Sequence, residues 1–448
     1  MRKFKKTASR VLSAALAMSM AASLTACGGQ NTTSTASEST AATTTAEGST
    51  AGKTYNGIDI SEHVDLKMIL LGERTPDFDE VYAEINKILE DKLNCSLSVD
   101  FLSWGEHDTK YSMKFSSQED FDIIFTAAGW AHYEQTVALG GFYELTPEFI
   151  QTYAPDIWKV VPEIAWNQAT IDGKIYMVPN LQSEFGQEVC AVRGDMLEKV
   201  GMDGISSWDD IVKFSLACAE QGMYTSANPF PQFYQSRGMN IVNGAPNNGE
   251  LVLYNTQDPD DLSFTYLLDW DGFTEYCHTV KELADAGAWS SDVLNSTEER
   301  QVPLMSGRAA TMWWGIDNCK GFADQINAEH PDWNVILCDP LENMPKRVRA
   351  YTNNGVALNA FGKHQERAMM VINEFYTNPE VQDLSALGIE GKHWKAVGDD
   401  QFTVIDESNY GVDGNCNWGW INETIRRHEY VENKTPRDEE VDEMTAAW

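Results

Sequence analysis

The sequence is poor in basic residues. It has 33 Lys and Arg against 68 Asp and Glu in 448 residues, which gives a formal net charge of −35 at pH 7. Nucleic acids and anionic membrane surfaces are bound through clustered Lys and Arg, because the neutralised phosphates release counterions. The chain lacks such clusters, so we expect no nucleic-acid partner, and its acidic surface is expected to serve solubility.

Long apolar runs are also missing, and no stretch reaches the length of a transmembrane helix. The short apolar stretch Val11 to Leu24 follows a basic segment and predicts a signal peptide over residues 1–26. The basic segment contains Lys3, Lys5, Lys6 and Arg10.

The stretch Leu24-Thr25-Ala26-Cys27-Gly28 resembles the lipobox of bacterial lipoproteins. That resemblance implies a diacylated Cys27 at the mature N-terminus; the alternative is an ordinary secretory signal with a chance Cys. Residues 27–54 are mostly Ser, Thr, Ala and Gly, which bury too little apolar surface to order. We therefore expect a membrane tether, with the folded protein on the extracellular face.

Paired cysteines are absent. The seven cysteines beyond Cys27 contain no C-x-x-C pair and no spacing typical of zinc. We expect scattered, mostly buried thiols, no metal and no cofactor, although a disulfide stays possible on sequence grounds.

Familiar catalytic motifs are missing as well. The chain has no G-x-S-x-G, H-E-x-x-H or G-x-G-x-x-G motif and no Walker loop. A protein that binds a solute without changing it fits these absences better than an enzyme does. A surface glycosidase stays open as an alternative, because two suitably placed carboxylates are not excluded among 68 acids.

Strand and helix patterns alternate in the first part of the chain. Val64 to Leu71 is a largely apolar run, Phe78 to Leu93 shows helical spacing, and Leu97 to Leu102 and Phe121 to Phe125 predict two more strands. This order favours an α/β lobe with a largely parallel sheet and a binding crevice beyond the carboxyl ends of the strands. The loops expected there are Gly72 to Asp77, Ser103 to Asp108 and Thr126 to Tyr133.

A second lobe is expected to begin near Ile171 to Pro179, a turn followed by a strand, after a helical region over Tyr153 to Trp166. Ser207 is predicted to cap a helix with acids in its first turn. Further helices are expected over Phe273 to Ala286 and Gln365 to Tyr376, and further strands near Ala309 to Trp314, Trp333 to Cys338 and Gly355 to Leu358.

Several stretches together resemble the extracellular solute-binding lipoproteins of ABC sugar importers, particularly a subgroup with a C-terminal domain of unknown function. They are Asp122 to Thr126, Ile171 to Pro179, Arg193 to Gly201, Gly307 to Trp314 and Gly388 to Trp394. The resemblance implies a two-lobed, periplasmic-binding-protein-like (Venus flytrap) α/β fold whose hinge closes over a ligand in the interlobe cleft. It also implies ABC permease subunits as partners, and we expect a monomer.

On this analogy the chain crosses between lobes near Tyr176 to Gln182 and returns near Tyr351 to Leu358. Residues 55–175 and 353–400 would form lobe 1, and residues 176–352 and 401–448 would form lobe 2. Thr435 and Pro436 mark a helix start close to the last residue, Trp448, so we expect further helices beyond this sequence.

A sugar has hydroxyl rims and apolar C–H faces, so its site needs aromatic platforms and polar side chains. Tryptophans past strand ends or in Gly-bounded loops are the aromatic candidates, although each has a core interpretation. They are Trp104, Trp130, Trp313, Trp314, Trp394, Trp418 and Trp420. The polar candidates are Glu73, Arg74, Asp77, Glu106, His132, Gln182, Glu184, Asn353 and Asn354, whereas Glu390 and His393 fit a structural role better.

The sequence thus predicts a carbohydrate or oligosaccharide ligand, and an oligopeptide importer component is the alternative. We further expect Trp130 and at least one of Trp313 and Trp314 to face each other across the cleft. Because successive strand residues point to opposite faces, only one of the adjacent pair is expected to reach the ligand.

Overall fold

The computed structural model describes residues 53–448, apart from 183–185, 187, 226–229, 243–251, 259, 292, 294, 295, 297, 347 and 433. The expected signal peptide, Cys27, nearly all of the tether and the candidate Glu184 therefore lie outside the described residues. No helix in the described part of the chain is long and apolar enough to cross a membrane.

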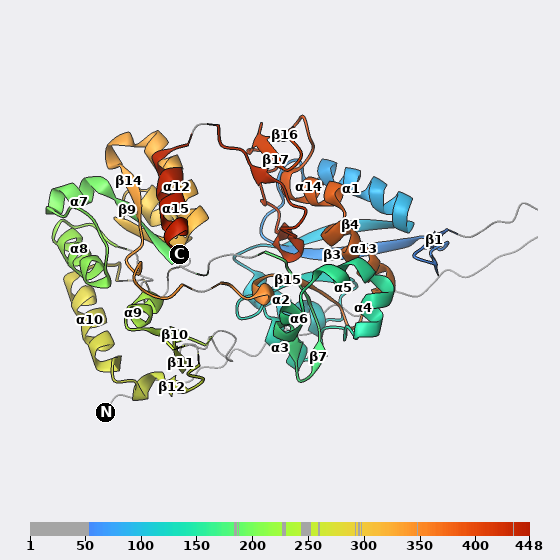
Figure 1. Cartoon of the computed structure of the whole chain (residues 1–448), viewed down its shortest axis with the longest axis horizontal. Coiled ribbons are helices and arrows are strands. Elements are labelled where there is room, and N and C mark those ends of the chain that lie inside the picture. Colours follow the sequence, from blue (N-terminus) through green and yellow to red (C-terminus); the bar gives the residue numbers. More distant parts are fainter. Residues whose placement is uncertain are drawn as a thin grey trace, which may run out of the picture. The chain divides into compact units, whose positions relative to one another are not determined.

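The first lobe contains a five-stranded sheet in the order β4-β3-β5-β15-β8. Figure 1 labels β3, β4 and β15 of this sheet. Its strands are β3 (Val64–Leu71), β4 (Cys95–Leu102), β5 (Ile123–Thr126), β15 (Gly355–Leu358) and β8 (Val178–Pro179). β3 runs parallel to β4 and β5, whereas β15 is antiparallel to β5 and β8. The expected parallel pairing is confirmed for three strands, and their carboxyl ends share one edge of the sheet.

Helices cover this sheet because their apolar residues recur with helical spacing. In α1 (Phe78–Leu93) the buried face includes Val81, Ile85 and Leu89. The other helices of this lobe are α2 (His107–Ser116), α3 (Tyr133–Ala138), α4 (Pro147–Tyr153), α5 (Pro155–Val160), α6 (Glu163–Gln168), α13 (Gln365–Thr377) and α14 (Pro379–Leu387).

The helical region expected over Tyr153 to Trp166 is divided into short helices. Pro155 begins α5 and Pro162 precedes α6. Proline lacks an N–H group and favours the first turn of a helix, so each one starts a new helix instead of extending the last.

The two predicted crossing segments lie side by side in the first sheet. Val178 of β8 pairs with Val356 of β15, and the Asn180 N–H donates to the Asn354 carbonyl at 3.0 Å. The expected start of the second lobe at residue 176 is therefore too early, because β8 still belongs to the first sheet. Small hairpin strands precede it, β6 (Thr170–Ile171) and β7 (Lys174–Ile175), and β1 (Thr54–Tyr55) pairs with β2 (Ile58–Asp59) near the start.

The assignment of residues 401–448 to the second lobe is corrected for residues 401–430. Tyr410, Cys416 and Trp420 belong to the hydrophobic core of the first lobe. The 3-10 helix η5 (Asn417–Trp420) is tied to this lobe by Tyr376, whose hydroxyl donates to the Gly419 carbonyl at 3.0 Å. A small sheet accompanies it, β16 (Trp394–Val397), β17 (Gln401–Val404) and β18 (His428–Glu429).

The second lobe contains an antiparallel sheet in the order β13-β9-β14. Alternate residues of β9 (Glu188–Arg193) enter different cores: Val189 packs with α12 (Ile316–Glu329), and Cys190 packs with α7 (Gly194–Val200) and α8 (Trp208–Glu220). The remaining elements are α9 (Phe230–Ser236), β10 (Met239–Ile241), β11 (Val252–Asn255), β12 (Phe264–Tyr266), α10 (Phe273–Ala286), α11 (Val302–Met305), β13 (Thr311–Gly315), β14 (Val335–Cys338) and α15 (Pro436–Ala447).

Both predicted helix caps are confirmed. The Ser207 hydroxyl accepts from the Asp210 N–H at the start of α8, and Thr435 forms a reciprocal capping box with Asp438 at the start of α15. The expected buried thiols are confirmed too: of the seven cysteines in the described part, six are buried, Cys277 is exposed, and none forms a disulfide there.

Candidate ligand-binding site

Three of the predicted tryptophans meet in the first lobe. The Trp104 and Trp418 rings are stacked, with centroids 5.9 Å apart and planes 19° from parallel. The Trp130 ring centroid lies 6.4 Å from that of Trp104. Trp104 is 43% exposed and Trp130 is 36% exposed, so part of each ring is open to a ligand. We call Trp104, Trp130 and Trp418 the aromatic platform.

The fold explains this meeting. Trp104 follows β4 and Trp130 follows β5, and parallel strands deliver their carboxyl-terminal loops to one sheet edge. Trp418 comes from η5, which packs against β15. Phe125 of β5 lies beneath, with its ring 5.5 Å from Trp130 and 6.0 Å from Trp418.

Gly72, at the end of β3, lets Trp104 lie close to the sheet. Its φ is +100°, which a residue with a side chain rarely adopts. A Cβ at this position would lie 3.2 Å from the Trp104 Nε1 atom. The platform therefore depends on a glycine beside it.

Hydrogen bonds hold two of the rings. The Trp130 Nε1–H donates to the Asn353 carbonyl at 2.8 Å, and the Trp418 Nε1–H donates to the Asp413 carbonyl at 3.1 Å. With the polar edges satisfied, the ring faces are what a ligand can contact. This suits C–H faces of sugar rings.

Polar side chains border the platform. His132 lies two residues after Trp130, and its Nε2 is 3.3 Å from the Asp108 carboxylate. His107 contacts Trp104 edge-to-face, with centroids 5.7 Å apart. Burial lowers the pKa of His132 from its ordinary value, and Asp108 partly opposes the shift.

Other predicted polar residues have different surroundings. Glu106 is exposed and pairs with Lys110 at 2.6 Å, whose hydrogen bond lowers the Glu106 pKa. Asn353 and Gln182 are half-buried, Asn354 is buried, and Glu73 is exposed. Asn353 supports the platform by accepting the Trp130 Nε1–H bond at its backbone carbonyl. Ligand contact by its side chain stays a prediction.

Two of the predicted polar residues hold loops together. Arg74 pairs with Asp79, bonds the Val99 carbonyl and lies over the Phe78 ring. Asp77 accepts from His393 at 3.0 Å and pairs with Lys392 at 2.9 Å. Both side chains thus hold neighbouring loops together, and their contact with a ligand stays a prediction.

His393 is structural, as the sequence indicated. It is 2% exposed, and its Nδ1 accepts from the Ile389 N–H at 2.9 Å. Its Nε2 therefore carries the proton that is donated to Asp77.

Three predicted tryptophans are core residues. Trp313 is 1% exposed, Trp394 is 4% and Trp420 is 2%. A ring so buried has no face left for a ligand, so these assignments are corrected. Their sequence positions looked loop-like, but helices or small strands cover them.

Trp314 differs from its neighbour Trp313, as strand alternation predicts. Trp313 packs in the core beside α7 and α8, whereas Trp314 is half-buried on the α12 side. Its ring stacks on Phe322 at 6.0 Å, and Arg300 lies 5.0 Å above it. Only Trp314 therefore remains as the partner expected for Trp130.

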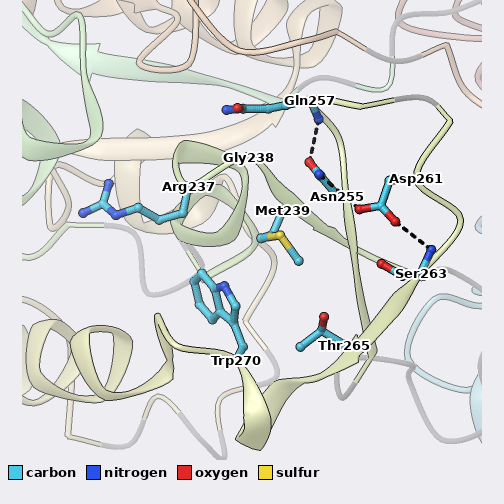
Figure 2. Close-up of a pocket in the computed structure, with 9 residues that line it drawn as sticks. All are labelled: Arg237, Gly238, Met239, Asn255, Gln257, Asp261, Ser263, Thr265 and Trp270. Carbon is cyan, nitrogen blue, oxygen red and sulfur yellow. Dashed lines mark hydrogen bonds between the residues drawn. The ribbon is translucent and has the colours of Figure 1, made fainter.

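A second polar site, on the second lobe, was not predicted. A pocket of about 340 Å³ lies beside the β10-β11-β12 sheet. Figure 2 shows the residues that line it, with Trp270 at one side. Asp261 accepts from the Ser263 N–H at 3.0 Å and from the Asn255 side chain at 3.3 Å. These bonds lower the pKa of Asp261, which leaves an ionised acceptor at the pocket. Trp270 could have been suspected from Trp270-Asp271-Gly272, a tryptophan in a Gly-bounded turn.

Two α/β lobes joined by crossing segments, with aromatic and polar groups at loop edges, define a two-lobed solute-binding fold. Residues 88–388 match the family described as bacterial extracellular solute-binding protein, and the chain belongs to that family.

The relatives agree with this assignment. The chain is 25% identical over 386 residues to a carbohydrate ABC transporter substrate-binding protein of Streptococcus pneumoniae, covering 84% of this chain and 74% of the relative. It is similar in fold to the N-glycan transport solute binding protein NgtS of S. pneumoniae, with TM-score 0.60, 22% identity, and 86% and 83% of the two chains covered. It is also similar to the alginate-binding protein AlgQ2, with TM-score 0.61, 14% identity, and 88% and 84% covered.

Proposed function

We propose that the protein captures a carbohydrate, most simply an oligosaccharide, and delivers it to the permease subunits of an ABC importer. The observation that carries this proposal is the aromatic platform of Trp104, Trp130 and Trp418, which offers open ring faces at a loop edge. Relatives named for carbohydrate and N-glycan transport support it.

Capture proceeds by closure of the two lobes, without chemical change to the ligand. A ligand favours the closed state only through contacts that the open state lacks. Trp314 and the pocket beside Trp270 are the second-lobe groups that we assign to such contacts. A peptide ligand would instead call for backbone-pairing strand edges, and the exposed aromatic faces favour a sugar.

The protein is held at the extracellular face of the membrane by lipid on Cys27, through the tether of residues 27–54. The lipobox-like sequence and the polar composition of the tether support this anchor. The folded part acts as a monomer above the membrane.

A thermal-shift screen of mono- and oligosaccharides, followed by calorimetry, tests the proposal on the chain without residues 1–27. Mannose and N-acetylglucosamine oligosaccharides belong in the screen, because structures of NgtS include complexes with Man1GlcNAc and Man5GlcNAc. A bound sugar should raise the melting temperature and be recovered intact after prolonged incubation. Cleavage that is lost on mutating a carboxylate would indicate a glycosidase, and stabilisation by peptides alone would indicate a peptide carrier.

A further inference from the structure

Two histidines and an aspartate converge beside the aromatic platform. His107 and Asp108 begin α2, and His132 precedes α3, so two separate loops supply them. The Nε2 atoms of His107 and His132 each lie 3.3 Å from the same Asp108 oxygen. All three candidate ligand atoms lie within 4.8 Å of one another, and no other such group of three occurs in the part of the chain that the structure describes.

The two nitrogen–oxygen distances match those between ligands of a tetrahedral metal site. Zinc binds His nitrogen and carboxylate oxygen at roughly 2.0–2.2 Å, so two ligands at a tetrahedral angle lie roughly 3.3–3.6 Å apart. Both Nε2–oxygen distances reach the lower end of this range.

The contacts of the two histidines suit metal binding. His107 Nδ1 lies 3.0 Å from the Trp104 carbonyl, which only accepts hydrogen bonds, so Nδ1 carries a proton and the neutral ring has its lone pair on Nε2. This carbonyl contact is the outer-shell arrangement common among metal-binding histidines.

The His132 Nε2 is buried and makes no hydrogen bond, although the Asp108 carboxylate lies 3.3 Å away. A buried polar atom without a partner is costly, and a bound cation would satisfy it.

We propose that His107, Asp108 and His132 bind a divalent transition-metal ion of the zinc class, which joins the loops carrying Trp104 and Trp130. Three protein ligands leave a fourth position for water. Asp108 is exposed, with 76% of its side chain accessible, so the metal has a path from solvent. The sequence did not predict this site, because its ligands come from two loops without a common motif.

The test is titration of the chelator-stripped protein with Zn²⁺ alone, by calorimetry, and with Co²⁺, by visible absorption. We expect one tight site and the d–d bands of a Co²⁺ ion with nitrogen and oxygen ligands. Loss of an outer-shell partner costs 10–100-fold in metal affinity, so His132→Ala, and separately Asp108→Asn, should weaken binding by at least about 100-fold.

His63→Gln is the matched control. His63 lies 3.2 Å from both Asp65 and Glu90, and neither of these contacts involves a second histidine. Its loss should therefore leave the tight metal site unchanged. Equal weakening in this control, or wild-type binding that survives His132→Ala, would show nonspecific binding to the acidic surface and overturn the proposal. The readout is metal binding itself, so it does not depend on which solute the protein carries.

Discussion

Trp104 stacks on Trp418 with ring centroids 5.9 Å apart, although one ring follows β4 and the other lies in η5 near the end of the chain. The two residues are fixed by different means, Trp104 against Gly72 and Trp418 through its bond to the Asp413 carbonyl. A surface made in this way is set by the fold and is present before a ligand arrives. Fewer side chains then have to be ordered when the ligand binds.

Trp130→Ala should weaken oligosaccharide binding by more than about tenfold, because an aromatic contact adds about 1 kcal/mol beyond the area that it buries. The lobe should stay folded, since Trp130 is 36% exposed. Calorimetry gives the affinity, and a melting curve of the free protein checks the fold.

Phe361→Ala is the control for that variant. Phe361 is 46% exposed and follows β15, whose antiparallel direction places it at the sheet edge opposite the platform. Its loss should leave affinity unchanged. If both variants weaken binding equally, or if neither does, Trp130 is no platform residue.

Gly72→Ala should destabilise the first lobe by about 1–3 kcal/mol, because φ of +100° is strained for alanine. The added methyl group, 3.2 Å from Trp104 Nε1, should also displace that ring and lower sugar affinity. Urea unfolding measures the first effect and calorimetry the second. A variant of wild-type stability and affinity would contradict the close packing described above.

The sequence was sufficient to predict the strands that support the site and the loops at their ends. Apolar runs mark β3, β4 and β5, and parallel topology then places Trp104 and Trp130 at one edge. What it did not predict is which aromatic rings are covered. Trp394 and Trp420 looked equally suitable, but their burial depends on contacts with Phe402 and Phe375 from other segments.

The prediction that the segment after residue 401 belongs to the second lobe was wrong for a similar reason. The segment that contains Tyr410 and Trp420 returns to the first lobe through packing on α14 and hydrogen bonds to Ser385. No local pattern distinguishes such a return from entry into the second lobe. His107 and Asp108 were overlooked as a pair because only the fold brings His132 to them.

Trp313→Ala and Trp314→Ala should have different effects. Removal of the fully buried Trp313 ring should cost about 3–5 kcal/mol of unfolding free energy, as for other large core residues. Trp314→Ala should cost less stability and, if this ring grips the ligand with Trp130, should lower affinity. Chemical unfolding and calorimetry separate these outcomes, and unchanged affinity in Trp314→Ala would remove it from the site.

Cys27→Ala should abolish lipid attachment, so that the protein is released into the medium or stays unprocessed. Fractionation of cells, with an antibody against the folded part, measures its location. Ser34→Ala, in the same tether, is the control and should stay membrane-bound. A Cys27→Ala protein that is membrane-bound with its signal removed would contradict the lipid anchor.

His132 should make stability depend on pH. Its folded-state pKa is lowered from 6.5, mainly by burial, and Asp108 partly opposes this while His107 adds to it. Between the lowered pKa and 6.5 the unfolded chain binds more protons than the folded chain, so stability is lost as pH falls below 6.5. The loss is complete below the folded-state pKa.

His132→Asn keeps a residue that tolerates φ of +61° and removes the titration. In chelator, urea unfolding at about pH 7.5 and about pH 5 should show a smaller difference for His132→Asn than for wild type. Equal differences in the two proteins would show that the burial of His132 has no such effect on stability.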